Sequence, residues 1–352
     1  MIANALPRPL TAGSVDNAIL RADGTDGTIL QTSGINIDDS TISTQANVAI
    51  TNQHSGQTNS SIVLTPKGTG AFIVGAKPNG AATGGNARGS KAICIVGDRT
   101  AATQVASGAD ATAIGYRATA SGLQSIAIGG TATGTNAIAL GPCTASGNND
   151  TAIAIGNNNT ASGGFGPIAM GTNAEASGVA SISMGRFLKA TGPFGIAFGF
   201  NPVADRFGMF AHAGGQFNAG NTGVGDAQRA RFVLRNKTTT NAAVELFLDG
   251  SSTRLTIPSG KVLALTINIC GISSTGAAVA HYMRQYALKN VSGTTSEVYA
   301  PITIGTDNAA GTSIALSASD ASDALVVSVT GTVSTIWRWV ASVDAVEIAF
   351  GT

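Results

Sequence analysis

The sequence predicts an all-β protein organised around a parallel β-solenoid, because one segment repeats with a period of about 14 residues. The repeat runs from Val105 to Asn201, and each unit pairs an Ala-Ser-Gly stretch with an Ala-Ile-Gly stretch. A unit of this length is too short for a helical hairpin and fits one solenoid coil. In residues 229–352, alternating apolar runs separated by turn residues predict antiparallel strands. Successive units end in a glycine, at Gly115, Gly129, Gly141, Gly156, Gly171, Gly185 and Gly199.

Each unit is expected to turn at its Ala-Ser-Gly stretch and to form a strand at its Ser-x-Ala-Ile-Gly stretch. The glycine of the first stretch suits a turn because it reaches positive φ without steric cost. Small and branched residues alternate in the second stretch, as they do in a strand. Stacked coils place equivalent residues above one another, which predicts an apolar ladder at the core of the repeat and of a trimer. The ladder comprises Ile114, Ile128, Leu140, Ile155, Met170, Met184 and Phe198.

A single solenoid of this composition is expected to be thin and marginally stable. Alanine and one large apolar residue per coil bury little surface. Between Ala118 and Gly185 the only charged residues are Asp150 and Glu175, and such an uncharged flank favours aggregation of a monomer. Packing several copies around an axis removes both problems, and cyclic symmetry closes the assembly.

The repeat resembles the head repeats of trimeric autotransporter adhesins. The shared pattern is Ala-x-Ala-Ser-Gly-x-x-Ser-x-Ala-Ile-Gly, which Ala118–Gly129 follows throughout, and the seven copies cover about a quarter of the chain. The resemblance implies left-handed parallel β-rolls packed into a homotrimer. The alternative is a low-complexity linker rich in alanine, glycine and serine, which the ordered ladder disfavours.

Two further patterns resemble bacteriophage fibre proteins. They are the segments Gly27–Asp39 and Leu64–Phe72. The sequence shows no signal-peptide pattern and no apolar run of 18 residues, whereas a bacterial adhesin of this type needs a leader and a membrane anchor. We therefore expect a virion fibre protein that is assembled in the host cytoplasm.

The chain divides into five predicted regions, which together would form an intertwined homotrimer. In the last region, Leu263, Leu265, Ile267 and Ile269 share one face and should be core. The regions are an N-terminal virion-attachment region (1–40), a β-shaft and joint (41–91), a β-roll (92–201), a cap or neck (202–228) and an antiparallel β-sandwich or jelly-roll tip (229–352).

The tip holds most of the aromatic side chains that suit sugar recognition, because a ring stacks on the apolar face of a sugar while its polar atom forms hydrogen bonds. The alternative is that the rings fill the core, which we expect for Trp339. Arg284 shares a face with two of the tyrosines and is either a polar receptor contact or a solvated charge at a strand edge. The candidate receptor-binding residues are Tyr282, Arg284, Tyr286, Tyr299 and Trp337.

Composition excludes several functions. A net charge of +1 gives no basic face for nucleic acid or an anionic membrane. Cys94, Cys143 and Cys270 lie far apart in apolar runs and are expected to be buried thiols without a disulfide. His212 is either a packed histidine or one member of a metal-binding ring on a three-fold axis. We expect no metal and no cofactor.

The sequence thus predicts a bacteriophage tail fibre that binds itself as a homotrimer. Its N-terminus would bind a phage tail or baseplate protein, and its tip a host glycan or outer-membrane receptor. Two alternatives stay open, a purely structural spacer and a glycan-degrading tailspike. The tailspike would need paired carboxylates, and no pair in the tip has a distinctive context. We therefore expect no catalytic activity.

Overall fold

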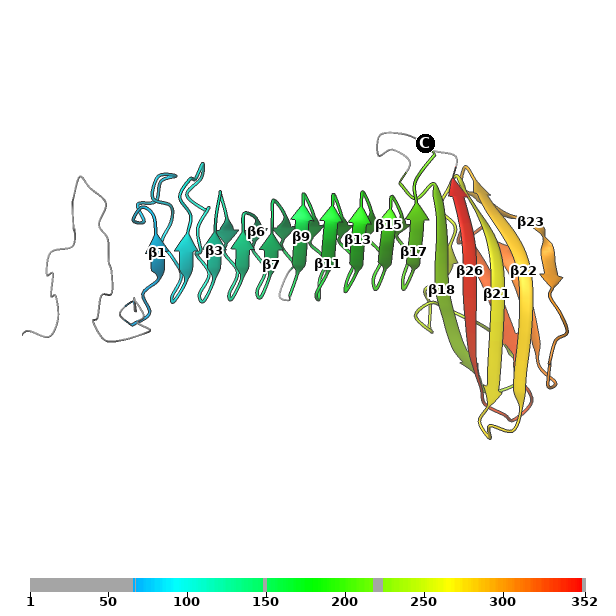
Figure 1. The fold of residues 1–352 in the computed structure, drawn as a ribbon. Helices are drawn as coiled ribbons and strands as arrows, with labels where there is room; N and C mark the ends of the chain where they lie inside the picture. The colour runs from blue at the N-terminus through cyan, green and yellow to red at the C-terminus, as the bar shows by residue number, and fades with distance from the viewer. Residues whose placement is uncertain (1–65, 67, 148–150, 218–223, 350–352) are drawn as a thin grey trace, which may run out of the picture. The chain divides into compact units, whose positions relative to one another are not determined.

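The computed structural model describes residues 66, 68–147, 151–217 and 224–349. These residues form strands, turns and loops without a helix, which confirms the predicted all-β class. A parallel β-solenoid, called the roll below, is followed by antiparallel sheets (Figure 1). The predicted attachment region and about half of the predicted shaft and joint lie outside the described residues.

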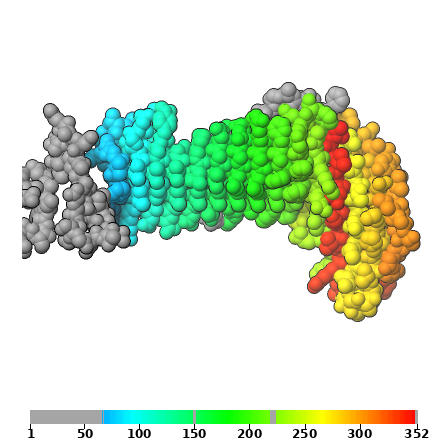
Figure 2. Space-filling view, in the orientation of Figure 1, coloured from blue at the N-terminus to red at the C-terminus, as the bar shows by residue number. Residues whose placement is uncertain are grey.

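The first sheet of the roll contains one short strand from each coil. Neighbouring strands pair in parallel and in register, so that equivalent residues stack, as Met170 does on Met184. The stacked coils contact one another directly along the roll (Figure 2). The strands are β1 (Phe72–Val74), β2 (Ile93–Ile95), β3 (Thr112–Ile114), β5 (Ile126–Ile128), β7 (Ile138–Leu140), β9 (Ile153–Asn157), β11 (Ile168–Thr172), β13 (Ile182–Arg186), β15 (Ile196–Phe200) and β17 (Phe210–Gly214).

The second sheet of the roll is made of two-residue strands that also pair in parallel. Each of these strands places an alanine at its second position, and the alanines stack on one another. The strands are β4 (Thr119–Ala120), β6 (Thr131–Ala132), β8 (Thr144–Ala145), β10 (Thr160–Ala161), β12 (Glu175–Ala176), β14 (Lys189–Ala190) and β16 (Val203–Ala204).

Alanine fills the interior of the roll from both sheets. On the first sheet the inward residue is the one between the two large apolar residues, such as Ala127 between Ile126 and Ile128. Ala127 and its counterpart Ala132 on the second sheet have no exposed surface. The predicted ladder is therefore stacked as expected but lies outside this interior. Strand alternation is the reason, since residues two apart share a face and only one face of a narrow roll is covered.

The glycines that close the units all have positive φ, so they turn the chain at the end of each first-sheet strand. At Gly171 a Cβ would also lie 1.9 Å from the carbonyl oxygen of Gly185 in the next coil. The glycines of the Ala-Ser-Gly stretches were predicted to turn by positive φ, and this is wrong. At Gly122, for example, glycine is required because a Cβ would meet the carbonyl oxygen of Gly134 at 1.9 Å.

The roll is longer than predicted at both ends. Strand β1 lies within the region predicted as shaft and joint, yet it pairs in parallel with β2. At the other end, β16 and β17 continue both sheets through the segment predicted as a cap. Pro202 interrupts the sequence pattern without interrupting the coil, because its position precedes β16 and needs no N–H for the ladder.

Two antiparallel sheets form the C-terminal domain. The larger one continues the first sheet of the roll, since β17 pairs antiparallel with β18. Its strands, in spatial order, are β18 (Ala227–Thr238), β26 (Trp337–Ala349), β21 (Lys261–Ser273), β22 (Val279–Val291) and β23 (Thr294–Thr303). The smaller sheet contains β19 (Ala243–Glu245), β20 (Leu255–Thr256), β24 (Ser313–Ser319) and β25 (Ala324–Thr330).

The C-terminal strand β26 lies between β18 and β21, which ties the end of the chain to the segment that leaves the roll (Figure 2). The predicted core face of β21 is confirmed, since its four residues are buried: Leu263, Leu265, Ile267 and Ile269. Cys94 and Cys143 are buried as expected, but Cys270 is exposed. The prediction for Cys270 is wrong because this residue alternates with Ile269 and therefore points away from the core.

Trp339 packs on a glycine in the neighbouring strand. Gly271 lies opposite Trp339 in the β21–β26 pair, and a Cβ at Gly271 would lie 2.4 Å from Cζ3 of the indole. Trp337 stacks on Trp339 with ring centroids 5.5 Å apart. The absence of a side chain at position 271 thus makes room for the largest side chains of the domain.

Gly271→Ala should lower the free energy of unfolding by about 1–3 kcal/mol, because the added methyl group overpacks the indole. The measurement is thermal unfolding followed by near-ultraviolet circular dichroism. Gly97→Ala is the control, since a Cβ there meets nothing within 4 Å. Equal melting temperatures of the two variants would contradict this packing account.

Candidate functional sites

The outward side of the first sheet carries two parallel columns of apolar side chains. One column is the predicted ladder, and the register of each strand pair confirms its stacking from Ile114 to Phe198. The other column lies two residues earlier in each strand. We call the two columns together the ladder face. The second column comprises Ile126, Ile138, Ile153, Ile168, Ile182 and Ile196.

Much of the ladder face is open to solvent in the single chain. Ile128 is 45% exposed and Phe198 is 49% exposed. Isolated exposed apolar residues are common on protein surfaces, but a continuous apolar stripe marks an interaction surface. The ladder residues therefore do not form the core of one roll, and they are placed where a second chain can contact them.

The ladder face ends in polar residues where the roll meets β18. His212 follows Phe198 in the ladder and stacks on its ring, with centroids 6.1 Å apart. The next outward residues are Arg229 and Arg231, which both form ion pairs with Asp344 at 2.9 Å. His212 is thus a member of the stacked column rather than part of an irregular cap. In the described ranges, no group of three His, Cys, Asp or Glu residues is placed to hold a metal ion.

Three of the five predicted receptor-binding side chains are buried in the C-terminal domain. They are Tyr282, Tyr286 and Trp337. A ring that is covered by protein on both sides presents no face for a sugar. These three residues are therefore corrected from receptor contacts to core. The alternation that placed Tyr282 and Tyr286 on one face is right, but that face points into the domain.

Each buried aromatic residue satisfies its polar atom inside the protein. The Tyr282 hydroxyl lies 2.7 Å from Oγ1 of Thr312, and the Tyr286 hydroxyl donates to Glu297 at 2.5 Å. Burial raises the pKa of both tyrosines above the ordinary value. The Trp337 indole N–H donates to Thr332 at 2.9 Å. This pairing explains how polar rings are tolerated in the core.

Arg284 and Tyr299 complete the predicted set. Arg284 is mostly buried and forms a bidentate ion pair with Asp307, in which both N–O distances are 2.7 Å. These hydrogen bonds hold the pKa of the Asp307 carboxyl below its usual range. Tyr299 on β23 is 40% exposed, so it is the one predicted aromatic residue that is open to solvent. The structure therefore does not bring the five predicted residues together on a surface.

The carboxylates of the C-terminal domain hold local structure. Asp249 accepts hydrogen bonds from the backbone N–H groups of Ser252, Thr253 and Ser251, which keep its pKa well below the usual range. Glu245 pairs with Arg254 at 2.7 and 2.8 Å. Every one of the eight described carboxylates accepts a hydrogen bond inside the chain: Glu245, Asp249, Glu297, Asp307, Asp320, Asp323, Asp344 and Glu347.

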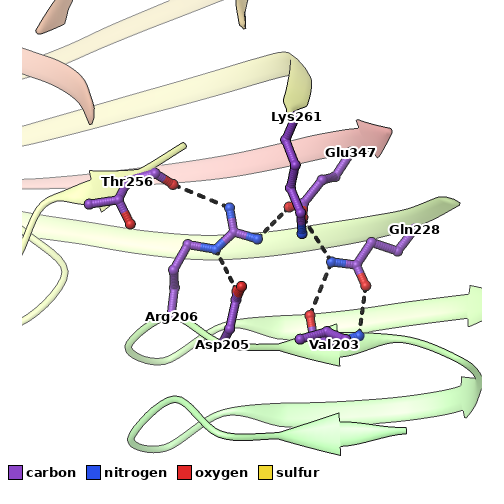
Figure 3. A network of polar contacts seen from close by, with 7 residues as sticks. All are labelled: Val203, Asp205, Arg206, Gln228, Thr256, Lys261 and Glu347. Atoms are coloured by element: carbon purple, nitrogen blue, oxygen red, sulfur yellow. Dashed lines mark hydrogen bonds and ion pairs between the residues drawn. The ribbon is translucent and has the colours of Figure 1, made fainter. Parts of the chain in front are cut away.

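A buried charged network joins the last coil of the roll to the C-terminal domain (Figure 3). Its centre is Glu347 on β26, whose side chain has no exposed surface and pairs with both Arg206 and Lys261. Arg206 comes from the loop after β16 and also donates to the carbonyl of Thr256 at 3.3 Å. Gln228 donates to Glu347 at 3.1 Å. Glu347 thus pairs with two cations from different parts of the fold, and Arg206 also pairs with Asp205 at 2.9 Å.

Gln228 also reaches back to the roll. Its side-chain amide accepts a hydrogen bond from the N–H of Val203 at 2.8 Å and donates to the Val203 carbonyl at 3.0 Å, as Figure 3 shows. These are the two bonds that the backbone of a neighbouring strand would form with Val203. The Gln228 amide therefore takes the place of a further strand at the end of the second sheet. The network therefore closes that sheet and fixes the C-terminal domain against the last coil.

A polar groove that the sequence analysis missed lies on the outward side of the second sheet. It crosses β4 and β6, has a volume of about 490 Å³, and is walled by the loop segments that precede the sheet. Tyr116 and Arg117, next to this groove, are both exposed. The signal in the sequence was available, because Tyr116-Arg117 follows Gly115 where three later coils carry an asparagine. The lining residues are Asn86, Thr103, Gln104, Ser107, Arg117, Thr119, Ser121, Thr131 and Thr133.

Comparison with known proteins supports the nature of the roll. The YadA head domain repeat matches residues 106–130, 131–142 and 168–187, in agreement with the resemblance to adhesin head repeats. No curated protein matches the chain. A similar solved structure is the tailspike protein gp49 from Acinetobacter baumannii bacteriophage Fri1, a capsular polysaccharide depolymerase, with 12% identity and a TM-score of 0.26. The match covers 80% of this chain and 50% of the tailspike, so this chain spans about half of that protein's length.

The search for membrane-spanning helices among the described residues found none.

Glu347→Gln should lower the free energy of unfolding by about 3–5 kcal/mol, because it removes the carboxylate that pairs with both Lys261 and Arg206 and leaves Arg206 only the partly exposed Asp205. Asp344→Asn is the matched control, since its arginine partners are more than half exposed and such pairs contribute about 1 kcal/mol or less. Chemical denaturation of the two variants measures the difference. Similar losses in both variants would show that the network does not join the roll to the domain.

Proposed function

We propose that the chain is the protomer of a homotrimeric bacteriophage fibre that attaches the virion to the host cell surface. The observation that carries this proposal is the ladder face, which extends along the roll and is exposed in the single chain. A surface of this kind gains stability when a second apolar surface covers it, by about 25 cal/mol for each Å² removed from water. Parallel side-by-side packing of rolls covers the ladder face along its whole length.

Three copies are supported by the adhesin-like repeat. The pattern resembles the heads of trimeric adhesins, and the family match covers coils near both ends of the repeat. Cyclic symmetry lets each roll present the same face to its neighbours without leaving an open end. A trimer also presents three copies of any receptor site, so weak contacts add through avidity.

Bacteriophage origin is supported by the sequence patterns of residues 27–39 and 64–72, which resemble phage fibre proteins. In this proposal the N-terminal region docks on the tail or baseplate, the roll is a stiff rod, and the chain binds the host surface. The exposed Tyr299 remains a candidate contact in the C-terminal domain, together with its neighbours on β23. The proposed role of the chain is to bind the host surface, which needs no cofactor.

Adsorption of the purified full chain to bacterial cells tests attachment. A panel of strains that differ in surface polysaccharide should show saturable binding to some strains and none to others. Competition by the unlabelled chain is the control for specific binding. A chain that adsorbs to no strain would contradict attachment and favour a structural spacer.

Ile128→Asp should abolish assembly while the single chain stays folded, because position 128 is exposed in one roll and would be buried between rolls. Thr160→Asp is the matched control, since it adds the same charge to the outward side of the second sheet. Sedimentation equilibrium should give three chain masses for the wild type and the control, and one for Ile128→Asp. A wild-type monomer, or a trimer of Ile128→Asp, would contradict the proposed interface.

A further inference from the structure

We propose that the polar groove over β4 and β6 is a binding site for an acidic oligosaccharide. The inference rests on the proposed function and gives it a location on the roll rather than on the C-terminal domain. The groove volume of about 490 Å³ falls in the usual range for small-molecule sites, about 300–1,000 Å³. The groove lies on the second sheet, whereas the ladder face lies on the first, so packing of rolls through the ladder leaves it open.

The hydroxyl groups of the groove are free to bind a ligand. Alternation along β4 and β6 turns their alanines inward, so the flanking Thr and Ser residues line the outer surface. Within the described part of the chain, none of these hydroxyls forms a hydrogen bond, because the stacked backbones satisfy one another. A sugar carries many hydroxyl groups that donate and accept, which this array complements. The free hydroxyls belong to Thr103, Ser107, Thr119, Ser121, Thr131 and Thr133.

Arg117 supplies the only charge among the residues that line the groove. No carboxylate in the described segments lies within 4.0 Å of its guanidinium group, although most arginines of the C-terminal domain are paired. Its recorded side-chain contact is with the ring of Tyr116, whose centroid lies 4.4 Å from Cζ. An unpaired guanidinium beside free hydroxyls favours a ligand that carries a carboxylate, since the two groups form paired charge-assisted hydrogen bonds.

Tyr116 adds an apolar surface beside the groove residue Arg117. Its side chain is 58% exposed, which makes it the most exposed aromatic residue with a polar handle among those described. A tyrosine ring stacks on the C–H face of a pyranose while its hydroxyl stays in water. The neighbouring Arg117 keeps the ring in place from one side. The aromatic ring, the hydroxyl groups and the guanidinium group thus match the C–H face, the hydroxyl groups and the carboxylate of an acidic sugar.

The fold does not require an arginine at position 117. Arg117 has a φ of 54°, a left-handed conformation that asparagine tolerates better than arginine. The equivalent corners of later coils carry Asn158, Asn173, Phe187 and Asn201, with φ of 55°, 53°, 53° and 68°. The N–H of each corner residue bonds to the preceding coil in the same way. An arginine at this corner is therefore not required by the fold.

The asparagine corners supply a variant that removes the guanidinium and should keep the fold. Arg117→Asn places in this coil the residue that other coils already use. Arg186→Ala is the matched control, because it also removes one positive charge together with arginine–aromatic contacts, here to Phe187 and Phe200. Arg186 lies 4.6 Å from the ring of Phe187, in a coil far from the groove in sequence.

The test is isothermal titration calorimetry of the full chain with linear oligosaccharides of galacturonic acid and of sialic acid. Carboxyl-reduced forms of the same oligosaccharides are the neutral counterparts. We expect binding of at least one acidic oligosaccharide, and a dissociation constant about 10- to 100-fold weaker for Arg117→Asn, as expected for one lost charge-assisted interaction. Tyr116→Ala should also weaken binding, and Arg186→Ala should leave it unchanged.

Three outcomes would overturn the proposal. They are no binding of either acidic oligosaccharide, equal binding of the carboxyl-reduced forms, and equal loss in Arg117→Asn and Arg186→Ala. Failure of this site is distinguishable from failure of the proposed function. A chain that adsorbs to cells while Arg117→Asn adsorbs equally well keeps its attachment function and lacks this site. A chain that binds the oligosaccharide through Arg117 but adsorbs to no cell keeps the site and loses the proposed role.

Discussion

The close stacking of coils around an interior of alanine is the constraint on which the rest of the structure depends. The coils approach so closely that a Cβ at Gly122 or Gly171 would meet the carbonyl oxygen of the next coil within 2 Å. Most inward positions of the two sheets accordingly carry small residues such as Ala127 and Ala139, and larger buried side chains such as Leu188 and Met209 lie outside the strands. The isoleucines, methionines and phenylalanines of the repeat are consequently placed outside. A roll with a small core and a large apolar exterior is stabilised when other chains cover that exterior.

The period of the repeat was sufficient to predict the solenoid, its coil boundaries and the stacking of Ile128 on its neighbours. It was not sufficient to say which side of the strand faces inward. Successive side chains of a strand point to opposite faces, so the pattern alone allows either face to be the inner one. The isoleucine face was predicted as the core because large apolar residues are usually buried. The closing of the roll around alanine depends on coil radius, which the sequence pattern does not contain. The predicted end of the coils at Pro202 was wrong for a different reason, because a proline that precedes β16 leaves the pairing of that strand intact.

In the C-terminal domain, alternation predicted the inner face of β21, and it could also have placed Cys270 on the outside. Strand β23 gives little alternation signal, because most of its residues, Thr294–Thr303, are exposed. The aromatic residues show the limit of composition as evidence for a binding site. Tyr286 and Trp337 suit sugars in isolation, but their hydroxyl and indole groups have partners in the core. Among the described tyrosines and tryptophans, Tyr116 in the roll is the one most open to solvent.

Oxidation of methionine by hydrogen peroxide tests the central claim, that other chains cover the ladder face. Met184 lies in the ladder and is 38% exposed in the single chain, whereas Met209 is fully buried. If the ladder face is covered, Met184 in the native assembly should oxidise as slowly as Met209, and dissociation into folded single chains should expose it. Rapid oxidation of Met184 in the native protein, with Met209 protected, would contradict the account.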